Sequence, residues 1–471
     1  MRKNFLPKSI LNFCLLLFVC SASAQNSRTR SYDEMARSIF AELIGINTTH
    51  STGNTTIAAN AIADRLKKAG FDAKDVLVVG PEERNKNLVA RIHGSGKRKP
   101  VLFLAHLDVV EAKREDWTMD PFVLTEKDGF FYGRGSLDIK SGVAILVTNF
   151  IRLKQEGYLP DRDLIIALTA GEESGKEYDG AEWLVNTQRS LIDAEFCINM
   201  DAGEPQRRNG RRLVRPIQVS EKGIFYMELE VKNPGGHSSQ PAKDNAIYRL
   251  ANGLVHLGAY DFPVQFSETT KSYFTTMANF ENGKLAEDMK SAGTGNPDSA
   301  VVNRLAKLPY YNAIMRTTCV ATMVEAGHAI NALPQSAKAT INCRLLPGTS
   351  EESVVHKIRE LLADTGISIK VTIPLIDGGN SPLTPEIKQT VDNVTEKLWP
   401  GITVMPILGV GASDGKYLRS AGLRTYGVSG VFLDVDDFRM HGRDERIRTT
   451  DLYDGLEYQY ELIRAFSSGT N

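Results

Sequence analysis

The stretch VLFLAHLDVV, residues 101–110, decides the fold class. Five apolar residues, Val101–Ala105, run without interruption and are followed at once by His106 and Asp108. A continuous apolar run of this length is typical of a strand that is buried on both faces of a sheet. Polar side chains that directly follow such a strand lie at the edge of the sheet where functional groups gather in open α/β domains. The stretch therefore indicates an α/β domain with a candidate site at that edge.

Further strands and helices extend this pattern in both directions. Amphipathic helices are predicted over 31–47 and 54–70. Three more apolar runs predict strands at Leu88–Ile92, Leu164–Leu168 and Phe196–Met200, and helical stretches at Lys140–Gln155 and Ala181–Thr187 separate the later ones. Strands that alternate with helices predict a largely parallel sheet. The same pattern returns late in the chain, with a helix at Glu386–Leu398 and a strand near Thr425–Val428.

The character of the sequence changes near residue 217. The segment FYMELEV, Phe225–Val231, is apolar at every second position, which is typical of an antiparallel strand with one face in water. The elements predicted after it are a helix at Asn245–Leu257, strands at Ala313–Val324 and Ala337–Leu345, a helix at Glu351–Asp364 and a strand at Ser368–Ile373. That order is ferredoxin-like. We therefore predict that an α+β domain, 217–376, is inserted into an α/β domain formed by 31–216 and 377–471, with no place assigned to 266–310.

The N-terminus predicts export. Basic Arg2 and Lys3 precede the apolar run Ile10–Val19, and small residues follow at Ala22–Ala24. This is the order of a secretory signal peptide, here 1–24, with cleavage near Ala24. The apolar run is shorter than the roughly 20 residues of a membrane span, so we expect no stable membrane anchor. Attachment of lipid at Cys20 is the less favoured alternative.

Composition excludes some classes of partner. Hydrophobic residues make up 42% of the chain, and 56 Lys+Arg nearly balance 57 Asp+Glu, for a net charge of -1. This balance gives no reason to expect a nucleic-acid partner. After removal of the signal peptide, Cys197, Cys319 and Cys343 remain, which allows one disulfide at most. Cys197 and Cys343 lie in apolar runs, so we expect them to be buried small hydrophobes.

Carboxylates follow the other predicted strands. Glu172 and Glu173 end one strand, Asp201 follows the next, and Asp138 stands where a Gly-rich loop meets a helix. Two adjacent carboxylates at a buried strand end are costly unless a positive charge lies beside them, and a metal ion supplies one. Each feature also has a structural explanation, such as a helix cap at Asp138 or a solvated acidic turn at the glutamates.

A late histidine completes a set of metal ligands. The set has three carboxylates and two imidazoles: His106, Asp138, Glu173, Asp201 and His441. Mixed oxygen and nitrogen donors suit zinc, with cobalt or manganese as alternatives. Two metal ions that share one bridging carboxylate would fit this number of ligands.

With these motifs the chain resembles a known family. The resemblance rests on the motifs AHLDVV (105–110), YGRGSLDIKSG (132–142), TAGEESG (169–175), NMDAG (199–203), GGHSSQP (235–241), NALP (331–334) and CRLLPG (343–348), and on His441. They are similar to the aminoacylase/carboxypeptidase family of zinc exopeptidases, which includes glutamate carboxypeptidase and carboxypeptidase S. The resemblance covers essentially the whole mature chain and implies a catalytic domain with an inserted lid or dimerisation domain.

The resemblance also implies roles for individual residues. His106 and Asp201 would hold one zinc ion, Glu173 and His441 the other, and Asp138 would bridge the two. Asp108 would orient the site, and Glu172 would be the general base.

The inserted domain would contribute residues that contact the substrate. The family pattern implies that His237 and Asn331 polarise the scissile carbonyl and stabilise its oxyanion. Arg344 would clamp the substrate carboxylate, for which a planar guanidinium is well suited. Ser413 and Asp414, in the α/β domain, would line the substrate pocket. Without the resemblance, His237 and Asn331 would be read as turn residues and Arg344 as a surface residue.

Substrate class and assembly stay open at this stage. The segment 310–348 most resembles carboxypeptidase S and secreted N-acyl-amino-acid hydrolases. We rank a carboxypeptidase or dipeptidase first, an N-acyl-amino-acid amidohydrolase second, and an inactive, metal-free binding protein on the same fold as a remote alternative. The edge of the small antiparallel sheet is a surface through which two chains could pair as a homodimer. The extra segment 266–310 could instead cover that edge.

Overall fold

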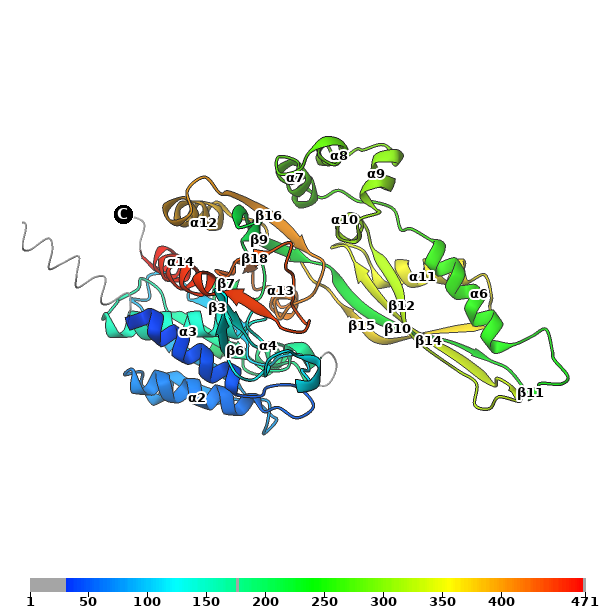
Figure 1. Cartoon of the computed structure of the whole chain (residues 1–471), viewed down its shortest axis with the longest axis horizontal. Coiled ribbons are helices and arrows are strands. Elements are labelled where there is room, and N and C mark those ends of the chain that lie inside the picture. The colour runs from blue at the N-terminus through cyan, green and yellow to red at the C-terminus, as the bar shows by residue number, and fades with distance from the viewer. Residues whose placement is uncertain (1–30, 175–177, 469–471) are drawn as a thin grey trace, which may run out of the picture.

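The computed structural model describes residues 31–174 and 178–468. Figure 1 shows a large domain and an elongated smaller domain that extends away from it. The predicted signal peptide, 1–24, lies outside the described residues. Residues 31–45 form the first described helix, close to the predicted 31–47.

A mixed sheet of ten strands forms the centre of the large domain. Its strand order is β1-β2-β6-β3-β7-β17-β9-β8-β18, with β16 paired to β9. The central strands β6, β3, β7 and β17 run parallel, whereas β1 and β2 are antiparallel to their neighbours. The bounds are β1 (Val76–Val79), β2 (Asn87–Ile92), β3 (Val101–His106), β6 (Leu164–Thr169), β7 (Phe196–Asn199), β8 (Gln206–Arg208), β9 (Arg211–Glu221), β16 (Thr403–Gly409), β17 (Thr425–Gly427) and β18 (Leu433–Asp434). The predicted α/β fold with a largely parallel sheet is confirmed.

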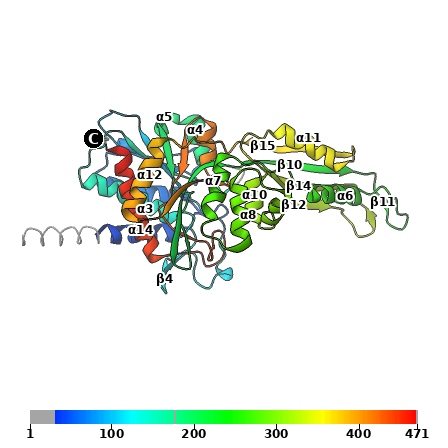
Figure 2. The ribbon, with the colours of Figure 1, turned by 90° about the horizontal axis from the view of Figure 1, so that it is seen from above.

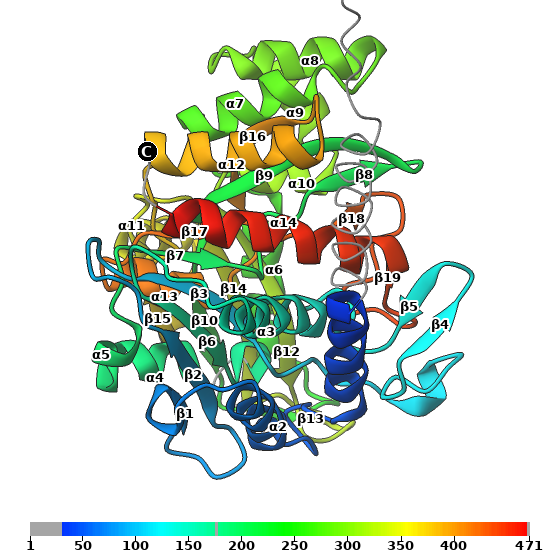
Figure 3. The same ribbon diagram turned by 90° about the vertical axis from the view of Figure 1, so that its left-hand side faces the viewer.

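Helices cover both faces of this sheet (Figure 3). In β3, Val101 and Phe103 face one cluster of apolar side chains, and Leu102 and Leu104 face another, because successive side chains of a strand point to opposite faces. The first cluster packs against α2 (Thr55–Lys68), α3 (Lys140–Gln155), α12 (Pro385–Leu398) and α14 (Thr449–Ser467). The second packs against α4 (Gly180–Thr187), α5 (Arg189–Ile192) and α13 (Gly415–Ser420). Burial on both faces explains why the predicted strands are continuously apolar.

The small domain is an antiparallel sheet with two helices. Its strand order is β12-β14-β10-β15, and the element order is strand-helix-strand-strand-helix-strand, as predicted. The elements are β10 (Gly223–Lys232), α6 (Ala246–Ala259), β12 (Thr318–Ala326), β14 (Ser336–Leu345), α11 (Glu351–Leu362) and β15 (Ile367–Ile376). Alternate residues of β10 and β14 are buried with α6 and α11, and Figure 2 shows both helices beside the sheet. The chain passes from β9 of the large sheet to β10 of the small sheet at Lys222.

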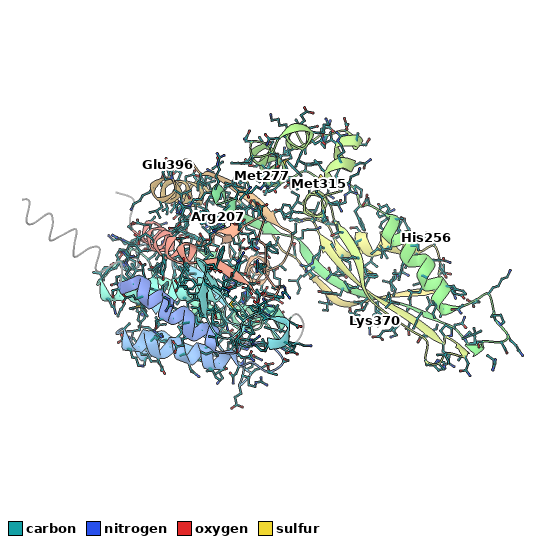
Figure 4. The ribbon with its side chains drawn as sticks, in the orientation of Figure 1. Arg207, His256, Met277, Met315, Lys370 and Glu396 are labelled. Atoms are coloured by element: carbon teal, nitrogen blue, oxygen red, sulfur yellow. A yellow bond between two sulfur atoms is a disulfide. The ribbon has the colours of Figure 1, made fainter. Side chains whose placement is uncertain are left out.

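The segment without a predicted place forms four helices. They are α7 (Glu268–Met277), α8 (Gly283–Gly293), α9 (Ser299–Leu305) and α10 (Pro309–Met315). Met277 and Met315, labelled in Figure 4, share an apolar cluster with Val214 of β9 and Met405 of β16. The segment thus packs on the large domain. The predicted start of a strand at Ala313 is wrong, because Pro309 stands in the first turn of a helix that continues to Met315.

Two small sheets and a disulfide complete the described part of the chain. Strands β4 (Thr125–Lys127), β5 (Phe130–Tyr132) and β19 (Arg446–Arg448) form one small sheet, and β11 (Gly236–His237) and β13 (Ala332–Leu333) form the other. Cys319 and Cys343 face each other across β12 and β14 and form a disulfide. The expectation that Cys343 is only a buried hydrophobe is therefore wrong, because the strand register brings it opposite Cys319. Cys197 is a buried free thiol, as expected.

Candidate metal centre and active site

The strands of the large sheet bring the predicted metal ligands to one edge. His106 is the last residue of β3, and Asp201 lies just beyond the end of β7. Glu173 lies in a short helix, Glu172–Ser174, that follows β6. Since β6, β3 and β7 are parallel neighbours, their carboxyl ends meet at this edge. Asp138 reaches the same place from the loop before α3.

Asp138 lies at the centre of the five residues. Its Oδ1 is 3.0 Å from His106 Nε2, and its Oδ2 is 2.9 Å from His441 Nε2. His106 Nε2 is 3.7 Å from Asp201 Oδ1, and His441 Nε2 is 3.1 Å from Glu173 Oε1. The carboxylate of Asp138 therefore presents one oxygen to each of two ligand groups.

The donor set fits two metal ions. His106, Asp138 and Asp201 place their ligand atoms within 4.8 Å of one another, and so do Asp138, Glu173 and His441. A third group of this kind combines His106, Glu172 and Glu173. Carboxylate oxygens and imidazole nitrogens suit divalent transition metals, and Asp138 belongs to both of the first two groups. The arrangement supports a dinuclear metal centre bridged by Asp138.

The electrostatics of the five residues show that negative charge is crowded here. Burial raises the pKa of Asp201 to about 6, and it also raises the pKa of Glu173. Hydrogen bonding to Asp138 and Glu173 raises the pKa of His441 to about 10. The neighbouring carboxylates likewise raise the pKa of His106 against the opposing effect of burial. Positive charge on the imidazoles therefore stabilises the cluster of carboxylates. Bound metal ions would supply that charge in place of protons.

Asp108 holds two parts of the site in place. Its carboxylate accepts hydrogen bonds from the backbone N–H groups of Gly171, at 2.8 Å, and Glu173, at 2.9 Å. Its backbone carbonyl lies 3.0 Å from His106 Nδ1. A carbonyl can only accept, so Nδ1 carries the proton and Nε2 is free to face Asp138 and Asp201. Asp108 therefore fixes the tautomer of one candidate ligand, His106, and the loop that carries another, Glu173.

Glu445 is a positioning residue that the sequence analysis did not single out. Its carboxylate is fully buried and accepts hydrogen bonds from the backbone N–H groups of Leu137, at 2.6 Å, and Asp138, at 3.0 Å. It also forms an ion pair with buried Arg134 at 2.6 Å. These contacts hold the loop that presents Asp138. The signal in the sequence is limited to a Glu four residues after His441.

Glu172 lies beside the ligands and faces the cavity. Lys416 Nζ is 4.0 Å from its Oε1 and 3.5 Å from Asp179 Oδ2. Burial raises the pKa of Glu172 well above its usual value, against the opposing effect of Lys416. A carboxyl group with a raised pKa next to a metal centre is suited to accept and return a proton.

A cavity of about 940 Å³ opens over the ligands and lies between the two domains. Its lining includes Glu172, four of the five ligand candidates and Ser413 from the large domain, and Arg344 from β14 of the small domain. Ser413 donates a hydrogen bond to buried Glu221 at 2.5 Å. Asp414 is not part of this lining: it is buried and accepts a hydrogen bond from Thr169 at 2.5 Å. His106 is likewise buried below the cavity surface.

His237 and Asn331 lie far from this cavity in the single chain. His237 belongs to β11, which pairs with β13, and the Asn331 carbonyl accepts a hydrogen bond from Ser238 N at 3.1 Å. Both residues are exposed, and neither lines the cavity. Figure 1 shows β11 at the tip of the small domain that is remote from the large domain. The chain alone does not bring these two residues to the metal ligands.

Comparison with known proteins places this fold and site in a family. Residues 102–465 match the family described as "Peptidase family M20/M25/M40". The N-fatty-acyl-amino acid synthase/hydrolase PM20D1 of Homo sapiens is 29% identical over 382 residues, which cover 78% of this chain and 74% of that protein. The probable carboxypeptidase S-like 2 of Dictyostelium discoideum is 25% identical over 387 residues, 78% of this chain and 71% of its own.

Solved structures agree on the fold. The M20 family metallo-carboxypeptidase Sso-CP2 from Sulfolobus solfataricus superposes with a TM-score of 0.69 at 18% identity, over 92% of this chain and 99% of that one. Since the family match spans most of the sequence, the chain belongs to the M20/M25/M40 peptidase family. Family and site together make it a metal-dependent hydrolase of amide bonds.

Proposed function

We propose that the protein is an exported two-zinc exopeptidase, a carboxypeptidase or dipeptidase, that cleaves the amide bond next to a free C-terminal carboxylate. The observation that supports this most is the position of Arg344. Arg344 lines the same cavity as Glu172 and four of the five candidate metal ligands. A peptide bond at the metal centre and a carboxylate at Arg344 would then be bound together.

The proposed metal centre uses the two groups of candidate ligands that share Asp138. His106 and Asp201 would hold one zinc ion, Glu173 and His441 the other, and Asp138 both; cobalt or manganese suits the same donors. Bound metal ions of this kind lower the pKa of a water molecule and polarise the scissile carbonyl. Glu172 accepts a proton from the attacking water and returns it to the leaving amine. Asp108 and Glu445 keep the ligand loops in place through their backbone hydrogen bonds.

Arg344 supports recognition of a carboxylate. Its Nη1 is buried and has no hydrogen-bond partner among the described residues. Burial also lowers the pKa of Arg344, which shows that its charge is poorly compensated. A substrate carboxylate would accept two parallel hydrogen bonds from the guanidinium and compensate its charge.

A second candidate substrate is an N-acyl-amino acid. The relative PM20D1 is named an N-fatty-acyl-amino acid synthase/hydrolase, and the lining of the cavity includes the apolar side chains of Ile407, Leu408 and Phe438. Such a substrate also ends in a free carboxylate, so Arg344 would serve it equally.

We infer that His237 and Asn331 act on the substrate of a second chain in a homodimer. Strand β12 is an edge strand, and its Val320, Met323 and Val324 are exposed, which suits pairing with another copy. The extra helices α7–α10 pack on the large domain and leave this edge free. The test mixes His237→Ala with Glu172→Gln under conditions of subunit exchange. Recovered activity supports action in trans, and continued inactivity of a confirmed mixture contradicts it.

Export is proposed from the sequence of residues 1–24. The Cys319–Cys343 disulfide supports it, because disulfides persist in oxidising compartments. No helix in the described part of the chain is both long and apolar enough to cross a membrane. Mass spectrometry of the secreted protein would test the site of cleavage, and an N-terminus at Gln25 is the expected result.

The proposed function is tested by a substrate screen. Zinc-loaded protein is assayed with dipeptides, longer peptides and N-acyl-amino acids, each also as its C-terminal amide. Hydrolysis of the free acids alone supports the proposal. Cleavage of the amides at equal rates, or no cleavage of any substrate by the metal-loaded protein, contradicts it.

A further inference from the structure

Two oppositely charged side chains enter the cavity from different domains and do not pair with each other. Arg344 comes from β14 of the small domain, and Glu204 comes from the loop between β7 and β8 of the large domain. Within the described residues, no ion pair joins either side chain to another residue. A cavity that holds two unpaired opposite charges is complementary to a ligand that carries both charges.

The surroundings of Glu204 compensate the negative charge of its carboxylate only weakly. Its neighbours Gly203 and Pro205 are buried, and Glu204 itself is only partly exposed. Arg215 lowers the pKa of Glu204, but its guanidinium is hydrogen-bonded elsewhere: it donates to the carbonyls of Gly203 and Pro216. Burial raises the pKa of Glu204 to about 7, and Asp201 and Asp138 contribute in the same direction. A backbone hydrogen bond lowers the pKa of Glu204 in part, but within the described residues the carboxylate has no cationic partner, so a ligand cation at this position would be stabilised.

The extra helical segment shapes the same wall. Tyr310 of α10 lines the cavity, and the charge of Glu204 raises the pKa of its phenol in addition to the larger effect of burial. Glu204 lines the same cavity, so the two side chains belong to one site. An aromatic ring beside a carboxylate displaces water, and charge pairs are stronger where water is displaced. The segment 266–310 thus contributes to the site near Glu204.

The position of Glu204 relative to the metal ligands limits which substrate group it meets. It follows Asp201 by three residues, and Glu204, Asp201 and Asp138 all line the same cavity. In a dipeptide, the α-nitrogen is separated from the scissile carbonyl carbon by a single atom. A free ammonium group of a dipeptide would therefore lie close to the metal centre, on the side of the carbonyl opposite to the carboxylate bound by Arg344.

We propose that Glu204 is a specificity-determining residue that accepts the free α-ammonium group of a dipeptide. Arg344 donates hydrogen bonds to the carboxylate of the same substrate, so this inference rests on the proposed function. It names zwitterionic dipeptides as the preferred substrate class. An N-acyl-amino acid supplies the carboxylate and no cation, and it would leave Glu204 without a partner. A site built around a charged hydrogen bond discriminates strongly against an analogue that lacks the bonding group.

The test compares two substrates that differ only in the amino group: alanyl-phenylalanine and propionyl-phenylalanine. For the zinc-loaded protein, we expect a kcat/KM about 10- to 100-fold higher for the dipeptide. Glu204→Gln should lower kcat/KM for the dipeptide by about that factor and leave hydrolysis of the propionyl compound within about threefold. Glu281→Gln is the matched control, because this carboxylate pairs with Arg208 outside the cavity. It should leave the ratio of the two substrates unchanged.

The outcomes separate this inference from the proposed function. Equal kcat/KM values for both substrates, or an equal loss for both in Glu204→Gln, would overturn the role of Glu204 while hydrolysis itself stands. If Glu204→Gln does not fold, the comparison of the two substrates with the unaltered protein decides the question. Failure to cleave either compound with both metals bound would overturn the proposed function instead.

Discussion

The substitution Glu445→Gln tests whether the loop that carries Asp138 depends on one buried carboxylate. In the structure this carboxylate is fully buried, pairs with Arg134 at 2.6 Å and accepts backbone hydrogen bonds from Leu137 and Asp138. Glutamine keeps the size of the side chain and one acceptor oxygen. It removes the charge, and Arg134, itself buried, is left without its anionic partner.

The structure indicates two separable effects. Removing one member of a buried ion pair costs about 3–5 kcal/mol, and we expect the lower end, about 3 kcal/mol, because glutamine retains one acceptor. That loss corresponds to a melting temperature about 5 °C lower for a domain of this size. The second effect falls on metal binding, because outer groups that position a ligand contribute about 10- to 100-fold to metal affinity.

Calorimetry of the metal-free protein and zinc titration measure the two effects separately. The control is Glu221→Gln, since Glu221 is also fully buried and pairs with Arg419 at 3.0 Å, away from the metal ligands. The control should lose similar stability and keep its zinc affinity. A zinc affinity of Glu445→Gln within about twofold of the unaltered protein would refute the assigned role of Glu445.

Three further predictions concern catalysis, recognition and stability. Glu172→Gln should lower kcat by about 10²- to 10⁴-fold and keep both metals, whereas Glu173→Gln should weaken metal binding at one site. Kinetics and metal analysis of both variants measure these effects. Equal metal loss in the two variants would mean that the two roles are wrongly assigned. Arg344→Ala should reduce hydrolysis of free-acid substrates by about 10- to 100-fold and remove the discrimination against C-terminal amides, measured as a ratio of kcat/KM values. Replacing Cys319 and Cys343 by Ser should lower the stability of the small domain by about 3 kcal/mol, measured by urea denaturation, and a loss below about 0.5 kcal/mol would contradict a structural role for the disulfide.

The parts of the fold that the sequence predicts are those in which a local pattern and the final environment agree. Val101–Ala105 and Leu164–Leu168 are continuously apolar because both faces of β3 and β6 are covered. The ligand positions follow from the same elements, since parallel strands end at one edge of the sheet. The order of strands and helices likewise predicts the small domain.

Other features depend on contacts between distant segments and leave little trace in the sequence. Strand β9 contains Arg212 and Arg215, so its sequence does not show the apolar pattern of a buried strand. The partners of these residues, Asp454 and Tyr458, are brought to them only in the folded chain. The disulfide depends on the register of β12 against β14. The role of Glu445 depends on a loop that precedes it by about 310 residues. The remote position of His237 follows from the extended shape of the small domain (Figure 1), which no local pattern encodes.

The number of metal ions bound per chain tests the central claim most directly. Purified protein is loaded with zinc, dialysed and analysed by inductively coupled plasma mass spectrometry, together with Asp138→Ala and Asp201→Asn. Because Asp138 faces both imidazoles, we predict about two zinc ions per unaltered chain, weakened binding of both in Asp138→Ala, and weakened binding of one in Asp201→Asn. A stoichiometry of one or zero in the unaltered protein, or loss of a single ion in Asp138→Ala, would contradict a dinuclear centre bridged by Asp138.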